Sequence, residues 1–175
     1  MFKIRAVLLL ILLLIGHHSI AQTCKYDQNE KDPFTGRLSA YIYIKSINDF
    51  SNVDVIVGIH NDSLYLSFNA TYGQILEENP TDSGGVLLLK LSNDSIIRLN
   101  IIPGRLTYIN NSKIISSTFS FGASLRKYDI SNLSSNMISV IRFTSRKADW
   151  TYYVKKDKGK KIQKAIDCIK ILQKN

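Results

Sequence analysis

Apolar residues alternate with more polar ones through residues 53–70, and the alternation is interrupted at Asn61-Asp62. A period of two indicates strands with one buried face, and a short Asn-Asp turn would fold two such strands into a hairpin. The facing pairs would be Ile59 with Leu64, Val57 with Leu66, Val55 with Phe68, and Val53 with Ala70. We predict this register, because a slip of one residue would turn the apolar set of one strand to the opposite face.

The alternation returns at 86–101, where Asn93-Asp94 occupies the turn position. A two-residue turn there predicts that Leu88 faces Leu99 and that Val86 faces Ile101. The second face of the first strand would carry Leu87, Leu89 and Leu91. This strand is therefore expected to be covered on both sides.

Other segments rich in β-branched and aromatic residues also indicate strands. They are 38–46, 105–110, 113–121, 137–144 and 149–155. Pro and Gly mark loops at Asn79-Pro80, at 83–85 and at Pro103-Gly104. Ser131 could cap a short helical turn that ends at Asn136.

One long helix is predicted over 157–173, where apolar residues recur at helical spacing. They are Ile162, Ala165, Ile166, Ile169 and Leu172. Consecutive strands followed by a helix do not indicate a parallel nucleotide-binding sheet. We predict a mainly β (α+β) domain: an antiparallel sheet or β-sandwich of about seven to nine strands with one C-terminal amphipathic helix.

The first 21 residues are typical of a signal peptide. Lys3 and Arg5 precede ten apolar residues at 6–15, and small residues surround a cleavage site after Ala21. A membrane span would need about 20 apolar residues. A lipoprotein is less favoured, because Thr23 stands before Cys24 where a small residue is required. We expect an exported protein, periplasmic or secreted, whose single domain is 22–175 and which keeps no transmembrane segment.

Two cysteines, Cys24 and Cys168, remain near the ends of the processed chain. An even pair in an exported protein predicts a disulfide. A metal or redox pair is not indicated, because no Cys-x-x-Cys motif occurs and His60 is the one histidine left after removal of the signal. We therefore expect no metal and no cofactor.

Catalytic residue sets are sparse in this sequence. His60 adjoins a predicted turn and is expected to be a surface residue, and no nucleophile-elbow or phosphate-loop motif occurs. Glu77, Glu78 and Asp82 could serve a carboxylate-dependent, glycosidase-like hydrolase acting outside the cytoplasm. We instead favour the interpretation that the protein is a non-enzymatic binding or accessory domain of the cell envelope.

Positive charge is concentrated at the C-terminal end. The chain has 23 Lys+Arg against 14 Asp+Glu, and residues 141–175 alone contain eleven Lys+Arg and three Asp+Glu. The densest part consists of Lys155, Lys156, Lys158, Lys160, Lys161 and Lys164. Such a patch can bind an anionic envelope polymer, lipid head groups or an acidic protein partner, although a solvated helix face has the same pattern. No base-stacking motif occurs, so nucleic acid is not an expected partner.

The segment 24–36 reads Cys-Lys-Tyr-Asp-Gln-Asn-Glu-Lys-Asp-Pro-Phe-Thr-Gly. It resembles the start of uncharacterised exported proteins of Bacteroidota, which carry a Cys-x-Tyr-x-x-Asn-Glu-x-Asp-x-Phe-Thr-Gly pattern after the signal peptide. The strand predicted near 138–143 and the Lys-rich, Cys-bearing helix are also similar to the ends of those proteins. The resemblance implies an envelope location and a cysteine pair, and it identifies no catalytic residue. Apart from the resemblance, residues 32–36 are typical of a turn, because Asp, Pro and Gly occupy positions that turns favour.

Overall fold

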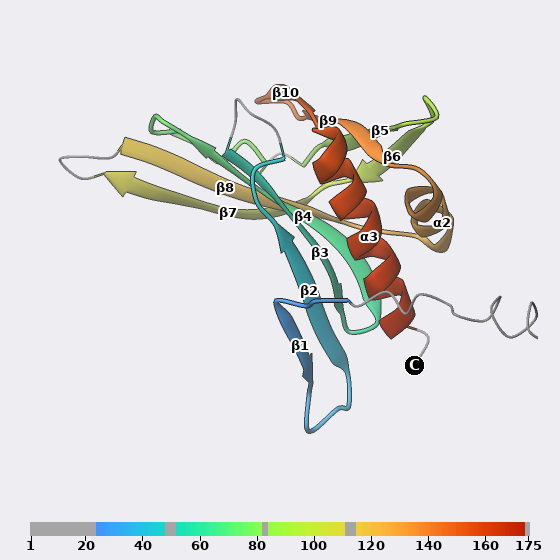
Figure 1. The fold of residues 1–175 in the computed structure, drawn as a ribbon. Helices are drawn as coiled ribbons and strands as arrows, with labels where there is room; N and C mark the ends of the chain where they lie inside the picture. Colours follow the sequence, from blue (N-terminus) through green and yellow to red (C-terminus); the bar gives the residue numbers. More distant parts are fainter. Residues whose placement is uncertain (1–23, 48–51, 82–83, 111–114, 174–175) are drawn as a thin grey trace, which may run out of the picture.

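The computed structural model describes residues 24–47, 52–81, 84–110 and 115–173 (Figure 1). In these ranges, ten strands form two antiparallel sheets, accompanied by two helices. The six-stranded sheet has the order β1-β2-β3-β4-β8-β7, made of Gln28–Lys31, Leu38–Ile44, Asn52–His60, Ser63–Tyr72, Ile115–Ser124 and Ile102–Asn110. The four-stranded sheet has the order β10-β9-β5-β6, made of Asp149–Tyr153, Ile138–Thr144, Val86–Leu91 and Ile96–Asn100. The helices are α2, Lys127–Ser135, and α3, Lys156–Leu172. The predicted mainly β architecture with a C-terminal helix is confirmed, while the predicted signal peptide lies outside the described residues.

The first predicted hairpin is confirmed in its register. β3 and β4 pair Ile59 with Leu64, and the three other predicted pairs are also present. All eight apolar residues are buried on one face. Asn61 and Asp62 both have positive φ, 48° and 64°, as a two-residue type I′ turn requires.

The predicted register of the second hairpin is wrong by one residue. β5 and β6 pair Leu87 with Leu99 rather than Leu88 with Leu99. The loop comprises residues 92–94 and is one residue longer than predicted, because the N–H of Leu91 donates to the carbonyl of Ser95 across it. Within this loop Asp94 has φ 64°. A left-handed residue closing a three-residue loop moves the register by one position. The buried side of β5 therefore carries Leu87, Leu89 and Leu91, and the other side is only half-buried or exposed.

The loop predicted at Pro103-Gly104 is also wrong, because both residues belong to β7. β7 is the edge strand of its sheet, where a proline removes no internal ladder bond. Its pairing with β8 is irregular between Pro103 and Leu106. At Gly104, an added Cβ would lie 2.3 Å from Oγ of Ser120, so the backbone passes too close for any side chain.

Two further elements extend beyond the predictions. β1 is a tenth strand, and the turn expected at 32–36 joins it to β2. In this turn the Asp32 carboxylate accepts the N–H groups of Phe34 and Thr35, and Gly36 has φ 70°.

The predicted helical turn starting at Ser131 is part of the longer α2. Its start is fixed by the buried Asp129 carboxylate, which accepts the backbone N–H and the guanidinium of Arg126.

The core lies between the two sheets and beneath α3. Aromatic rings from β4 and β8 pack against rings from β9 and β10 in tilted arrangements; Phe121 and Phe143, for example, have centroids 4.9 Å apart and an interplanar angle of 43°. The Tyr72 and Tyr152 hydroxyls share a hydrogen bond of 2.5 Å across the same interface. α3 packs on β2, β3 and β9. The helix therefore lies beside the smaller sheet and covers the β2–β3 end of the face of the larger sheet that points into the core (Figure 1).

Candidate anion-binding groove

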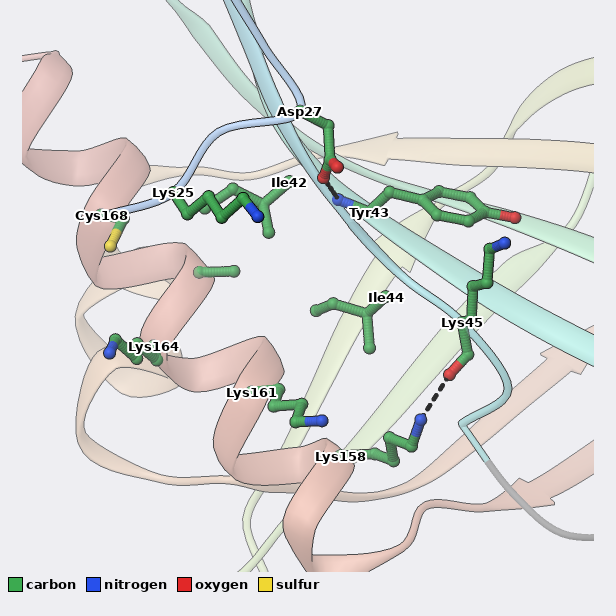
Figure 2. Close-up of a pocket in the computed structure, with 11 residues that line it drawn as sticks. Lys25, Asp27, Ile42, Tyr43, Ile44, Lys45, Lys158, Lys161, Lys164 and Cys168 are labelled. Carbon is green, nitrogen blue, oxygen red and sulfur yellow. Dashed lines mark hydrogen bonds between the residues drawn. The ribbon is translucent and has the colours of Figure 1, made fainter. Parts of the chain in front are cut away.

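A groove of about 490 Å³ lies between β2 and α3. Its floor is apolar, and lysines from three parts of the chain surround it (Figure 2). The floor residues are Ile42, Ile44, Ala165 and Cys168. The lysines are Lys25, Lys45, Lys158, Lys161 and Lys164, and the remaining lining residues are Asp27 and Tyr43.

The periodicities of the two elements place these side chains. Alternation along β2 turns Ala40, Ile42 and Ile44 toward α3, and Ala40 and Ile44 are fully buried there while Ile42 remains half-buried. On α3, the spacings of three and four residues from 158 to 168 put the lining residues along one side of the helix. The helix therefore lies beside β2 without closing over Ile42.

The N-terminal segment forms the third wall. β1 pairs with Leu38–Tyr41 of β2, so the following part of β2 extends beyond its partner strand. There the Asp27 carboxylate takes the place of a strand and accepts the backbone N–H of Tyr43 at 2.6 Å. Asp27 is thus already engaged with the backbone at the edge of the groove.

A disulfide between Cys24 and Cys168 fixes this wall to α3, as the sequence predicted. The Tyr26 hydroxyl donates a hydrogen bond of 3.1 Å to the carbonyl of Cys168, and burial raises the pKa of Tyr26. These two links, from Cys24 and Tyr26, both end on Cys168 and fix the segment around Lys25 to the helix.

Positive charge dominates the groove, with five lysines facing one aspartate. The Lys158 ammonium donates to the carbonyl of Lys45 at 2.7 Å. Within the described part of the chain, no carboxylate lies within 4.0 Å of any of the five ammonium groups. Lys158 and Lys161 also lie in the first two turns of α3, where the helix dipole adds positive potential.

The structure divides the six predicted lysines. Lys158, Lys161 and Lys164 line the groove, whereas Lys155, Lys156 and Lys160 do not. Sequence analysis missed Lys25 and Lys45, which reach the groove through the disulfide-linked segment and β2. Neither residue lies near the helix in sequence, so no local pattern could have joined them to it.

The carboxylates of the hydrolase hypothesis lie elsewhere. Glu77 and Glu78 are exposed beside a depression of about 390 Å³ that also touches Trp150, and Asp82 lies outside the described residues. Lys147 contacts Glu78 at 2.5 Å, and its hydrogen bond and charge lower the pKa of the Glu78 carboxyl. A glycosidase acid needs the opposite shift, so this loop does not favour that chemistry.

Other candidate chemistries gain no support from the described residues. His60 is exposed, as predicted, and its Nδ1 shares a hydrogen bond of 2.9 Å with Oγ of Ser39. Within the ranges described above, no three His, Cys, Asp or Glu side chains are grouped so that they could hold a metal ion. Neither described helix has the length and apolar character needed to cross a membrane.

Comparisons with known proteins add no functional assignment. No protein-family model matches the chain, and no curated protein or solved structure is significantly similar to it.

Proposed function

We propose that this protein is an exported, non-enzymatic binding domain of the cell envelope that holds an anionic ligand in the groove between β2 and α3. The observation that carries the proposal is that five lysines and one aspartate line a groove with an apolar floor. The predicted signal peptide and the disulfide support an oxidising compartment outside the cytoplasm. The likeness of segment 24–36 to exported proteins of Bacteroidota supports the same location.

The convergence of these lysines favours a ligand over a merely solvated helix face. On a solvated face, lysines spread into water, and each ammonium is screened from the others. Here lysines from the N-terminal segment, β2 and α3 are held around one concavity. A bound anion would interact favourably with several of these ammonium groups at once and with the positive end of α3.

Salt-dependent retention on phosphocellulose tests the proposal. The groove variant Lys25→Gln/Lys161→Gln is compared with the control Lys156→Gln/Lys160→Gln, which removes the same charge from exposed positions of α3 outside the groove. We expect the wild type and the control to elute together at high salt and the groove variant to elute at clearly lower salt. Equal shifts for the two variants would mean that net charge alone causes retention, and the groove would lose its role.

A further inference from the structure

We infer that the ligand of this groove is a single-chain anionic amphiphile, an alkyl phosphate or alkyl carboxylate, with its chain on the apolar floor and its head group among the lysines. The inference rests on the proposed function, since it names the ligand class of the same site. It follows from the floor, from the placement of the ammonium groups, and from the finding that none of the exposed large apolar side chains among the described residues lines the groove.

The floor calls for an apolar ligand part. Ile42 is half-buried although it lies on the face of β2 that α3 covers, and the space beside it measures about 490 Å³. This volume is within the range of about 300–1,000 Å³ that small-molecule sites occupy. A small hydrophilic anion would leave the exposed part of Ile42 in contact with water, whereas an alkyl chain would remove apolar surface from water on both partners.

The lysines suit a head group at the mouth of the groove. In Figure 2, Lys25 and Lys161 extend toward the gap between β2 and α3, and the Lys158 ammonium meets the backbone carbonyl of Lys45. The Lys45 ammonium points away from Lys158 toward the Tyr43 ring, and Lys164 points away from the gap. The ammonium groups of Lys25, Lys158 and Lys161 can approach one anionic head, and their methylene stems extend the apolar walls above Ile42 and Ile44. The groove is therefore apolar at its floor and positively charged at its rim.

A single amphiphile fits better than a bilayer surface. Among the described residues, large apolar side chains are exposed elsewhere on the molecule, and none of them lines the groove. They are Phe34, Ile75, Ile96, Ile102, Tyr108, Ile109, Ile115, Tyr128, Tyr153 and Ile171. A surface that inserts into lipid presents such side chains outward. Here the apolar part is recessed beneath lysines, so an alkyl chain has to enter the protein.

Isothermal titration of the full processed chain with alkyl phosphates of increasing chain length, kept below micelle formation, tests this inference. We expect affinity to rise about fourfold per added methylene until the floor is filled, and to fall with added salt. Inorganic phosphate serves as the head group without a chain, and decanol as the chain without a head group. Both are expected to bind at least about a hundredfold more weakly than decyl phosphate.

Two matched variants locate the chain. Ile42→Thr keeps a β-branched residue in β2 but removes apolar contact from the floor, and it should weaken dodecyl phosphate binding about tenfold. Ile56→Thr makes the same change at a half-buried position of β3 that alternates away from the core-facing Val55 and Val57, and it should leave binding unchanged. Thermal melts of both variants establish that the fold is retained.

The outcomes separate this inference from the proposed function. Equal affinity for inorganic phosphate and alkyl phosphates, still dependent on Lys25 and Lys161, would overturn the amphiphile and leave an anion-binding groove. Binding to vesicles of phosphatidylglycerol and phosphatidylcholine without binding to monomeric alkyl phosphate would overturn it in favour of a membrane surface. Equal weakening of dodecyl phosphate binding in Ile56→Thr and Ile42→Thr would also count against it. No groove-dependent binding of any anion would remove both proposals.

Discussion

At the scale of single residues, Gly58 illustrates how a cross-strand neighbour can exclude a side chain. Gly58 pairs with Tyr65, and a Cβ added to Gly58 would lie 2.5 Å from Cζ of that ring. Gly58→Ala should therefore displace the half-buried Tyr65 ring and lower the free energy of unfolding by about 1–3 kcal/mol. Urea unfolding measures the change. Gly73→Ala is the control, because nothing lies within 4 Å of its added Cβ, and it should stay within about 0.5 kcal/mol of the parent. Equal effects would show that the ring is not the obstacle.

Tyr43 provides a residue-scale prediction about pH. Its hydroxyl donates to the Asp54 carboxylate, and burial together with this bond and the carboxylate charge raises the pKa of Tyr43 to about 12. In the unfolded chain the pKa is about 10. Because the folded state favours the neutral phenol, its contribution to stability is complete below pH 10 and is lost as the pH rises toward 12.

Tyrosinate absorbance titration of the native protein measures this shift. Asp54→Asn should lower the pKa of Tyr43 toward the ordinary value, since the hydrogen-bonded carboxylate is removed while an oxygen acceptor for the Ser46 N–H stays. Tyr43→Phe should delete one high-pH step from the curve and identify it. An unchanged titration in Asp54→Asn would contradict the role assigned to this pair.

At the scale of elements, the two hairpins show what local sequence can and cannot determine. Both turns contain Asn-Asp-Ser, and only the first adopts the two-residue connection. In the first hairpin, four facing apolar pairs agree with that turn, so pattern and turn chemistry favour one register. In 86–101 both faces of the strand are apolar, so the pattern accepts either register. The conformation of Asp94 then decides, and the sequence does not reveal it.

The first turn allows a direct test of this reasoning. Asp62 has φ 64°, a conformation in which a Cβ is unfavourable and glycine is not. Asp62→Gly should be at least as stable as the parent in urea unfolding. Asp62→Ala should be less stable than Asp62→Gly by about 1–2 kcal/mol, because alanine has neither the freedom of glycine nor the polar side chain of aspartate. An alanine variant as stable as the glycine variant would argue against a type I′ turn.

At the scale of the whole molecule, the order of strands could not be predicted from the sequence. Most strands and α3 were located within a few residues, because their apolar periodicity is local. The pairing of β4 with β8 and the division into two sheets depend on contacts between distant residues, such as the Phe121 and Phe143 rings. The groove has the same origin: three of its lysines were identified on α3, and two others arrive only through the tertiary fold.

The disulfide is the feature that joins this molecular scale to the proposed site. Cys24 and Cys168 are 144 positions apart, so their bond closes almost the whole described chain and restricts the unfolded state. Cys24→Ser/Cys168→Ser should lower the free energy of unfolding by about 2–4 kcal/mol. It should also weaken dodecyl phosphate binding well below the melting temperature, because Lys25 is no longer held against α3. Denaturant unfolding and isothermal titration measure the two effects.

Tyr26→Phe separates the covalent link from its neighbouring hydrogen bond. It removes the bond to the carbonyl of Cys168 and should cost about 0.5–1.5 kcal/mol of stability while the disulfide keeps the wall in place. If the serine variant loses stability but binds dodecyl phosphate as well as the parent, the N-terminal wall has no part in the site. If binding falls in the serine variant, does not return at low temperature and is retained in Tyr26→Phe, the same bond that stabilises the domain also shapes the groove, because the fold brings Lys25 to α3 through Cys24.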